Sequence, residues 1–219
     1  MKRNLELTCP FCGINKVQHN HKKFIGMEHV PPKCIFTNVL KKDLITIPSC
    51  HKCNNSTSQM DEKFIYHLSI YLGIDTKAKQ HLWNKSRSLL KKKPNWRTDI
   101  LQNTSQLYLP YYQGYGRQTK LDARIIKTVA EKIIRGLHWY FTETVLPPDI
   151  KLTIELLKQG TDVEALDKSI SILLNNGKIL SKCEGQFEVI YNIATDSNHA
   201  SVWLIKFYGE NVILGIVTP

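Results

Sequence analysis

The N-terminal third of the chain carries only short apolar runs, and their pattern predicts the order strand, strand, helix. The runs at 22–26 and 44–47 have the length and residue types of short strands, and Pro48 is expected to end the second. The helix is expected to begin at Ser58, because a hydroxyl residue followed three positions later by an acid fits a capping pattern. Apolar residues then recur at helical spacing before a stop at Gly73. They are Phe64, Ile65, Leu68 and Leu72.

A longer amphipathic pattern covers residues 121–141, where an apolar residue recurs every four positions between charged ones. These positions are Leu121, Ile125, Val129, Ile133 and Leu137. A second helix is predicted over 162–175, before an Asn-Asn-Gly stop. Beyond it, apolar patterns predict three strands at 187–193, 201–208 and 212–217. The second half is therefore expected to form an antiparallel meander packed on helices.

The segment between these two parts is basic and contains two tryptophans, Trp83 and Trp96. Such a mixture is compatible with phosphate contacts and base stacking, and equally with a solvated helix face whose Trp83 belongs to the core. Its cations, all within 77–97, are Lys77, Lys79, Lys85, Arg87, Lys91, Lys92, Lys93 and Arg97. Residues 108–118 are rich in tyrosine, but their glycines and proline favour a linker over a base-stacking surface.

The composition is typical of a water-soluble globular protein, with 42% hydrophobic and 22% charged residues. The 219 residues suffice for one domain of ordinary size, or for a small domain and a medium one. No apolar run approaches the roughly 18 residues of a membrane span, and no secretory-signal pattern is seen at the start. We therefore expect a cytoplasmic protein with reduced thiols and no membrane partner.

The positive charge is concentrated in the first half of the chain. Residues 1–100 carry 18 Lys and Arg against 7 Asp and Glu, whereas residues 101–219 carry 12 of each kind. A basic segment attached to a neutral one suggests a polyanion-binding module joined to a part with another role. A surface that only confers solubility is the alternative.

Four of the six cysteines form two Cys-x-x-Cys pairs, Cys9 with Cys12 and Cys50 with Cys53. Two such pairs are typical of a tetrahedral Zn²⁺ site, whose binding energy stabilises a module with little core of its own. Unpaired core cysteines or a redox pair are the alternatives. The other two, Cys34 and Cys183, have no partner spacing and are interpreted as structural thiols.

The stretch between the cysteine pairs contains Gly-Met-Glu-His-Val-Pro-Pro-Lys at 26–33. Pro31 and Pro32 push the residues before them toward extended geometry, so Glu28 and His29 are expected at the end of a strand. A tetrahedral zinc site would bring this strand close to the helix start at Asn54, which follows the last cysteine. Taken alone, the histidine also suits a zinc ligand or a loop residue, and His19, His21 and His51 compete for its role.

This combination of motifs resembles the HNH endonucleases with a ββα-metal fold, in particular the type with two zinc knuckles that resolves branched DNA in phages. It consists of Cys-x-x-Cys, an acid-His-Val-x-Pro stretch, a short strand and Cys-x-x-Cys-Asn, over about residues 8–72. The resemblance says nothing firm about residues 77–219. It implies an α+β protein whose N-terminal zinc-clipped ββα module cleaves nucleic acid.

The resemblance also implies roles for single residues. His29 is expected to be the general base, and Glu28 and Asn54 are expected to bind one catalytic cation, Mg²⁺ or Mn²⁺. The cysteine pairs are expected to hold the structural zinc. Asp43 is the nearest candidate by spacing for the residue that orients the histidine, a position where the family usually has Asn or His. Glu28 is a further departure, because Asp is commoner there.

The chemistry of phosphodiester hydrolysis requires residues of these types. Imidazole activates water near neutral pH, and a cation neutralises charge on the phosphoryl and leaving oxygens. Carboxylate and amide oxygens suit Mg²⁺, whereas thiolates select zinc. The expected reaction is endonucleolytic hydrolysis that leaves 5′-phosphate and 3′-hydroxyl ends, on DNA in the first place.

Two other functions remain open from the residues alone. One is a non-catalytic zinc module that binds nucleic acid, and the other is an RNA-cleaving, toxin-like nuclease, since phosphate contacts do not read the sugar. The expected organisation is a nuclease module at 1–75, a basic helical bridge and linker at 76–118, and a helical and antiparallel-strand domain at 119–219. That last part is expected to serve target choice, self-association, a protein partner or regulation.

Overall fold

The computed structural model describes residues 7–16, 26–37, 43–71, 77–120, 122–157, 161–195 and 199–219. Some predictions concern positions outside these ranges. They are most of the strand at 22–26, the competing residues His19 and His21, the helix end at Leu72 and Gly73, and Leu121.

The N-terminal part follows the predicted order of strand, strand and helix. Strands β1 (Leu7–Thr8) and β2 (Asn15–Lys16) form a small antiparallel pair. Strand β3 (Gly26–Val30) ends directly before the two prolines, and a 3₁₀ turn, η1 (Lys33–Ile35), follows. Strand β4 (Ile45–Ser49) pairs antiparallel with β3, and helices α1 (His51–Ser56) and α2 (Ser58–Tyr71) come next. Helix α2 begins at the predicted residue.

Pro48 does not end the second strand, as the sequence had suggested, but lies within it opposite Met27. The described sheet at this point has two strands only, β3 and β4. A proline is tolerated in such a strand because its missing N–H can lie on the side without a partner strand. The strand therefore continues to Ser49 and delivers the chain directly to the second cysteine pair.

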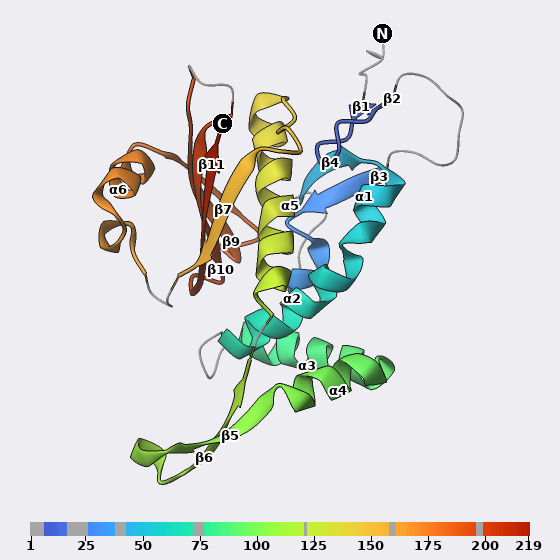
Figure 1. The fold of residues 1–219 in the computed structure, drawn as a ribbon, viewed down its shortest axis with the longest axis vertical. Coiled ribbons are helices and arrows are strands. Elements are labelled where there is room, and N and C mark those ends of the chain that lie inside the picture. Colours follow the sequence, from blue (N-terminus) through green and yellow to red (C-terminus); the bar gives the residue numbers. More distant parts are fainter. Residues whose placement is uncertain are drawn as a thin grey trace.

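The middle of the chain forms two helices and a hairpin. Helix α3 (Lys77–Lys92) and helix α4 (Pro94–Gln102) are followed by strand β5 (Thr104–Leu109), the 3₁₀ turn η3 (Pro110–Tyr112) and strand β6 (Gly114–Thr119). The two strands pair antiparallel along their whole length, and the hairpin projects from the body below α3 and α4 (Figure 1).

The interpretation of 108–118 as a linker is therefore wrong. The rings of Tyr108 and Tyr115 pack edge to face across the hairpin, with centroids 5.3 Å apart. Gly116, which suggested a loop, has a packing role, because a Cβ there would lie 2.8 Å from Cδ1 of Leu109. A glycine inside a strand thus marks a close side-chain approach rather than a break in the strand.

Helix α5 (Ala123–Thr142) is the central element of the second half (Figure 1). Strands β7 (Lys151–Leu156), β8 (Lys178–Lys182), β9 (Phe187–Ile193), β10 (Ser201–Phe207) and β11 (Asn211–Thr218) form an antiparallel sheet in the order β7-β11-β10-β9-β8. One face packs on α5. The other face is covered by η4 (Val163–Ala165) and α6 (Lys168–Asn175). No described helix is long and apolar enough to cross a membrane.

The predicted antiparallel meander is present, but three of its details were not predicted. Strands β7 and β8 were missed, and α6 begins at Lys168 rather than at 162. The carboxylate of Asp167 accepts a hydrogen bond from the backbone N–H of Ser169 at 2.9 Å and so caps the later start. Strands β7 and β8 lie at the two edges of the sheet, where solvent exposure weakens the apolar signal that sequence patterns detect.

Helix α5 joins the two halves of the chain through one continuous core. A Cβ on Gly136 would lie 2.7 Å from Val30 of β3, so the helix backbone directly contacts the N-terminal hairpin. Phe64 of α2 also packs edge to face on Phe207 of β10, at a centroid distance of 5.4 Å. The boundaries predicted at 75 and 118 stay a prediction, but the parts at 1–75 and 119–219 share their hydrophobic interior.

Candidate metal centre and adjoining site

The four predicted zinc cysteines lie together. The sulfurs of Cys9, Cys12, Cys50 and Cys53 are all within 4.8 Å of one another, and the pair formed by Cys12 and Cys50 is 3.7 Å apart. Zinc–sulfur bonds of about 2.3 Å in a tetrahedron give sulfur–sulfur edges of roughly 3.8 Å. The donor set and its spacing therefore fit one structural Zn²⁺.

Local backbone geometry forms both halves of this cluster. At the first pair, the N–H of Gly13 donates to the carbonyl of Cys9 at 2.9 Å, and Gly13 has the left-handed φ of +70° that closes such a knuckle. At the second pair, Cys50 caps helix α1, and its sulfur accepts a hydrogen bond from the N–H of Cys53 at 3.4 Å. Burial opposes ionisation, but this N–H and the neighbouring thiols lower the pKa of Cys50.

The two remaining cysteines have no place in the cluster. Cys34 directs its thiol to the carbonyl of Asp61 at 3.9 Å, and Cys183 directs its thiol to the carbonyl of Asp43 at the same distance. Burial raises the pKa of each thiol to about 11, so both are poor nucleophiles at neutral pH. This arrangement agrees with their interpretation as structural thiols.

Glu28 belongs to a buried ion-pair network that sequence reasoning missed. Its Oε1 is 3.0 Å from Nζ of Lys132 on α5, and the same ammonium is 2.8 Å from Oδ2 of Asp61 on α2. All three residues are buried, with exposed fractions of 8% or less. Burial raises the pKa of both carboxyls, while the charge of Lys132 acts in the opposite direction. The ammonium of Lys132 on α5 thus links this helix to the β3–β4 hairpin and to α2.

Glu28 and His29 point to opposite faces of β3, because successive side chains alternate along a strand. Glu28 shares its face with Gly26, and a Cβ built on Gly26 would lie 3.7 Å from Nδ2 of Asn54. Asn54 in α1 therefore stands on the Glu28 side of the hairpin. His29 is half-buried on the other face, where its partner across the hairpin is the exposed Thr46 of β4.

Asp43, the candidate for orienting His29, lies outside the paired part of the hairpin. The last pair joins Val30 to Ile45, two residues beyond Asp43. The backbone carbonyl of Asp43 faces the turn that contains Cys183, between β8 and β9. Thr46, not Asp43, is the residue paired with His29 across the hairpin. Spacing along the chain suggested Asp43, but the pairing register of the two strands decides which side chains are neighbours.

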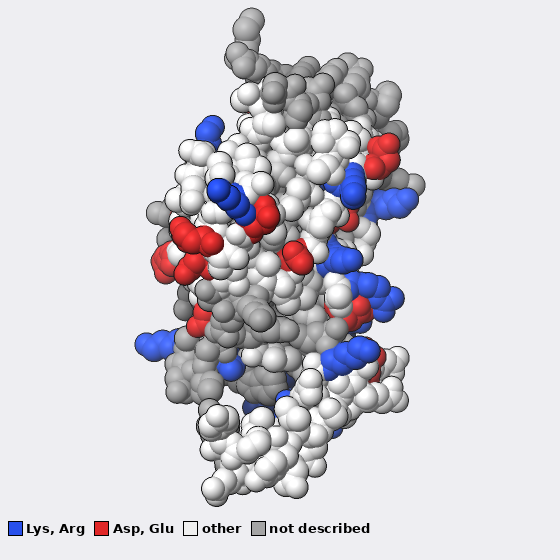
Figure 2. All heavy atoms as spheres, turned by 60° about the vertical axis from the view of Figure 1, so that its left-hand side comes forward, with Lys and Arg blue, Asp and Glu red and all other residues white. Residues whose placement is uncertain are grey.

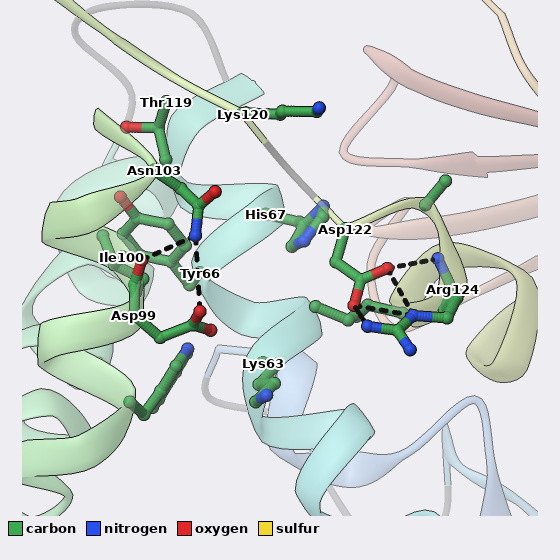
Figure 3. Close-up of a pocket in the computed structure, with 13 residues that line it drawn as sticks. Lys63, Tyr66, His67, Asp99, Ile100, Asn103, Thr119, Lys120, Asp122 and Arg124 are labelled. Carbon is green, nitrogen blue, oxygen red and sulfur yellow. Dashed lines mark hydrogen bonds and ion pairs between the residues drawn. The ribbon is translucent and has the colours of Figure 1, made fainter. Parts of the chain in front are cut away.

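A separate polar cavity of about 460 Å³ lies between α2, α4 and the start of α5 (Figure 3). Two of its charged residues, Asp122 and Arg124, pair with each other, and the others are Lys63, Asp99 and Lys120. The carboxylate of Asp122 caps α5 and binds the guanidinium of Arg124 at 2.8 Å, while Asp99 accepts a hydrogen bond from the side chain of Asn103. The cavity therefore carries both signs of charge and offers no single class of ligand a matched surface.

Two buried histidines make the stability of the fold sensitive to acid. Burial lowers the pKa of His67 and of His138 to about 4, from an ordinary value of 6.5. Between these values the unfolded chain binds more protons than the folded one, so stability is lost as pH falls from 6.5 and is unaffected above it. We expect a loss of about 3 kcal/mol for each histidine by pH 4, since one pKa unit corresponds to about 1.4 kcal/mol.

Urea unfolding at neutral and acidic pH measures this effect. The double variant His67→Gln and His138→Gln should show a shallower fall in unfolding free energy with acid than the wild type. The exposed residue His81 provides the matched control, and His81→Gln should leave the slope unchanged. Equal slopes in the double variant and the wild type would contradict the assignment of the acid sensitivity to His67 and His138. Any metal that acid releases from the cysteine cluster would affect all variants alike.

Comparison with known proteins gives no match: no family model, no curated protein and no solved structure resembles the chain at a significant level.

Proposed function

We propose that this protein is a metal-dependent HNH-type endonuclease that hydrolyses phosphodiester bonds of nucleic acid, with DNA as the first substrate to test. The observation that carries the proposal is the position of the four-cysteine cluster. The cluster connects the first cysteine pair, between β1 and β2, to a strand–strand–helix unit formed by β3, β4 and α1. The second strand of this unit leads directly into the second cysteine pair. The unit bears His29 on its first strand and Asn54 directly after Cys53.

His29 is assigned the role of general base in this proposal. His29 is half-buried, and it lies on the face of β3 opposite to the buried Glu28 and Val30, beside the exposed Thr46 of β4. An imidazole nitrogen can accept a proton from an attacking water, which is the role of a general base. Thr46, its neighbour across the hairpin, is a hydroxyl residue that can contact the ring from the same face.

Glu28 and Asn54 fit a divalent cation only in part. Both lie on the same side of β3 and offer the hard oxygen donors that Mg²⁺ or Mn²⁺ prefers. A cation held there would neutralise charge on the phosphoryl group. Oε1 of Glu28, however, already pairs with Lys132, so a divalent cation has to share this carboxylate with a buried ammonium.

Replacing His29 with alanine is expected to reduce plasmid cleavage by at least about 100-fold, the contribution of a positioned general base. The assay compares the wild type with His29→Ala on supercoiled plasmid, with Mg²⁺, with Mn²⁺ and without added divalent cation. His51→Ala is the matched control, because His51 is an exposed histidine on α1 beside the zinc cluster. This control should cut like the wild type.

Each other outcome has a defined meaning. Equal cutting by the wild type and His29→Ala would exclude His29 as the base. If no variant cuts but all retard the plasmid in a gel, the second candidate function is favoured, a zinc module that binds nucleic acid without cleaving it. The specific observation in favour of that alternative is the ion pair between Glu28 and Lys132, which gives the acid a structural role.

A further inference from the structure

A second cavity, which we call the basic groove, lies where α3 and α4 meet the base of the β5–β6 hairpin. Its volume is about 490 Å³, within the range of roughly 300–1,000 Å³ that is usual for ligand sites. Its apolar walls are formed by Tyr66, Ile70, Trp83, Leu90, Ile100 and Leu101. Its charged residues are all cationic, and they are Arg87, Lys91, Arg97 and Arg117.

The four cations of the basic groove are available for a ligand. All four side chains are exposed, and none makes an ion pair with an acidic side chain within the described part of the chain. They come from three elements, α3, α4 and β6, which converge on one opening. Cations gathered without counter-charges create a positive potential that favours an anionic partner.

The wall of the groove offers an aromatic surface for stacking. Trp83 is 43% exposed, and its ring packs beside Tyr66 at a centroid distance of 6.4 Å. Tyr66 in turn contacts the buried ring of Trp96 edge to face, at 6.2 Å. Trp83 is thus supported from behind while its outer part remains open. Planar bases stack on such supported rings without regard to their sequence.

The neighbouring hairpin adds aromatic surface but little charge. Tyr108, Tyr111 and Tyr115 are 52%, 99% and 72% exposed. The projection that the hairpin forms at the lower end of the molecule shows almost no charged side chain in Figure 2. Arg117 is the only charged residue between Thr104 and Thr119, and it lines the basic groove. The polar cavity on the other side of Tyr66 differs, since it contains Asp99 and Asp122 (Figure 3).

We propose that the basic groove binds a single strand of nucleic acid, with one unpaired base stacked on Trp83 and the flanking phosphates held by the four cations. An apolar wall, an exposed ring and exclusively positive charge match the base and the phosphates of a nucleotide. The choice of nucleic acid rests on the proposed function, which places cleavage at the zinc-clipped unit. The groove lies outside that unit and would hold the strand away from the cleavage site.

The test measures binding rather than cleavage. A fluorescently labelled oligothymidine is titrated with the full-length protein by anisotropy, without added divalent cation and at several salt concentrations. Trp83→Ala should weaken binding roughly 10- to 100-fold, and Trp83→Phe should retain most of the affinity. Arg87→Ala, Arg97→Ala and Arg117→Ala together should reduce the salt slope by about 2, roughly 0.7 for each lost phosphate contact on a single strand.

The matched control removes two exposed lysines of the second half, Lys151 and Lys168, by alanine substitution, and should leave affinity unchanged. An oligouridine of the same length tells whether the sugar matters, and a blunt duplex should be insensitive to Trp83→Ala. Unchanged affinity in the arginine triple variant, or an equal loss in the lysine control, would overturn the proposal. Binding that depends on the groove without any plasmid cleavage would leave the groove established and contradict cleavage of DNA.

Discussion

Replacing Lys132 with methionine is expected to lower the free energy of unfolding by about 3–5 kcal/mol at pH 7, the usual cost of removing one partner from a buried ion pair. The variant leaves Glu28 and Asp61 buried without their shared counter-charge, although the aliphatic volume of the side chain is kept. Oδ1 of Asp61 is buried and has no hydrogen-bond partner among the described residues, so few other groups can compensate. Urea denaturation followed by circular dichroism measures the loss.

Three comparisons test whether charge causes this loss of stability. The loss should become smaller as the pH is lowered, because burial raises the pKa of both carboxyls and a protonated carboxyl no longer needs the counter-charge. Adding Glu28→Gln and Asp61→Asn to Lys132→Met should restore part of the stability, since it removes the buried charges that have lost their partner. Lys127→Met, at an exposed position on the same helix, should change stability by less than about 0.5 kcal/mol. A triple variant as unstable as the single one would contradict the electrostatic explanation.

Loss of zinc is expected to unfold at least the N-terminal unit. Apparent binding energies of structural zinc are about 10–16 kcal/mol in small zinc modules, and here the site ties β1 and β2 to β4 and α1. Cys53→Ser should therefore reduce the zinc content from one ion to less than one per chain and lower the melting temperature markedly. Metal analysis of the purified protein and thermal unfolding with and without a strong chelator measure both effects.

The chain contains its own control for this experiment. Cys34 is also partly buried, but its sulfur faces the carbonyl of Asp61 rather than the cluster. Cys34→Ala should keep one zinc ion per chain and respond to chelator like the wild type. If the purified protein contains no zinc, or if the chelator leaves its melting temperature unchanged, the interpretation of the cluster as a structural metal site is wrong.

The local part of the architecture was predictable from the sequence. The paired cysteines predicted the cluster, because two-residue spacing within each pair brings both sulfurs to one point. The prolines after Val30 predicted the end of β3, and the Ser-x-x-acid pattern at Ser58 predicted the beginning of α2. The four-residue apolar period predicted α5, which begins at Ala123 after its cap Asp122 rather than at 121. Each of these features depends on interactions between residues that are close in sequence.

The sequence misled where packing overrides local preference. Gly116 and Pro110 suggested a linker, yet the cross-strand contact between Tyr108 and Tyr115 forms part of a regular hairpin. Pro48 suggested a strand end, yet a two-stranded sheet tolerates it. In both cases the partner strand decides the outcome, and a partner strand cannot be read from one segment alone.

By itself, the sequence determined the four-cysteine cluster, the main helices and the basic character of the first half. The tertiary structure decided the environment of Glu28, because Lys132 is 104 positions away in sequence and reaches it only when α5 packs on the hairpin. It also decided that the cations of α3, α4 and β6 converge on the basic groove. Side-chain chemistry is encoded residue by residue, but which charges become neighbours, and whether water reaches them, is fixed only by packing.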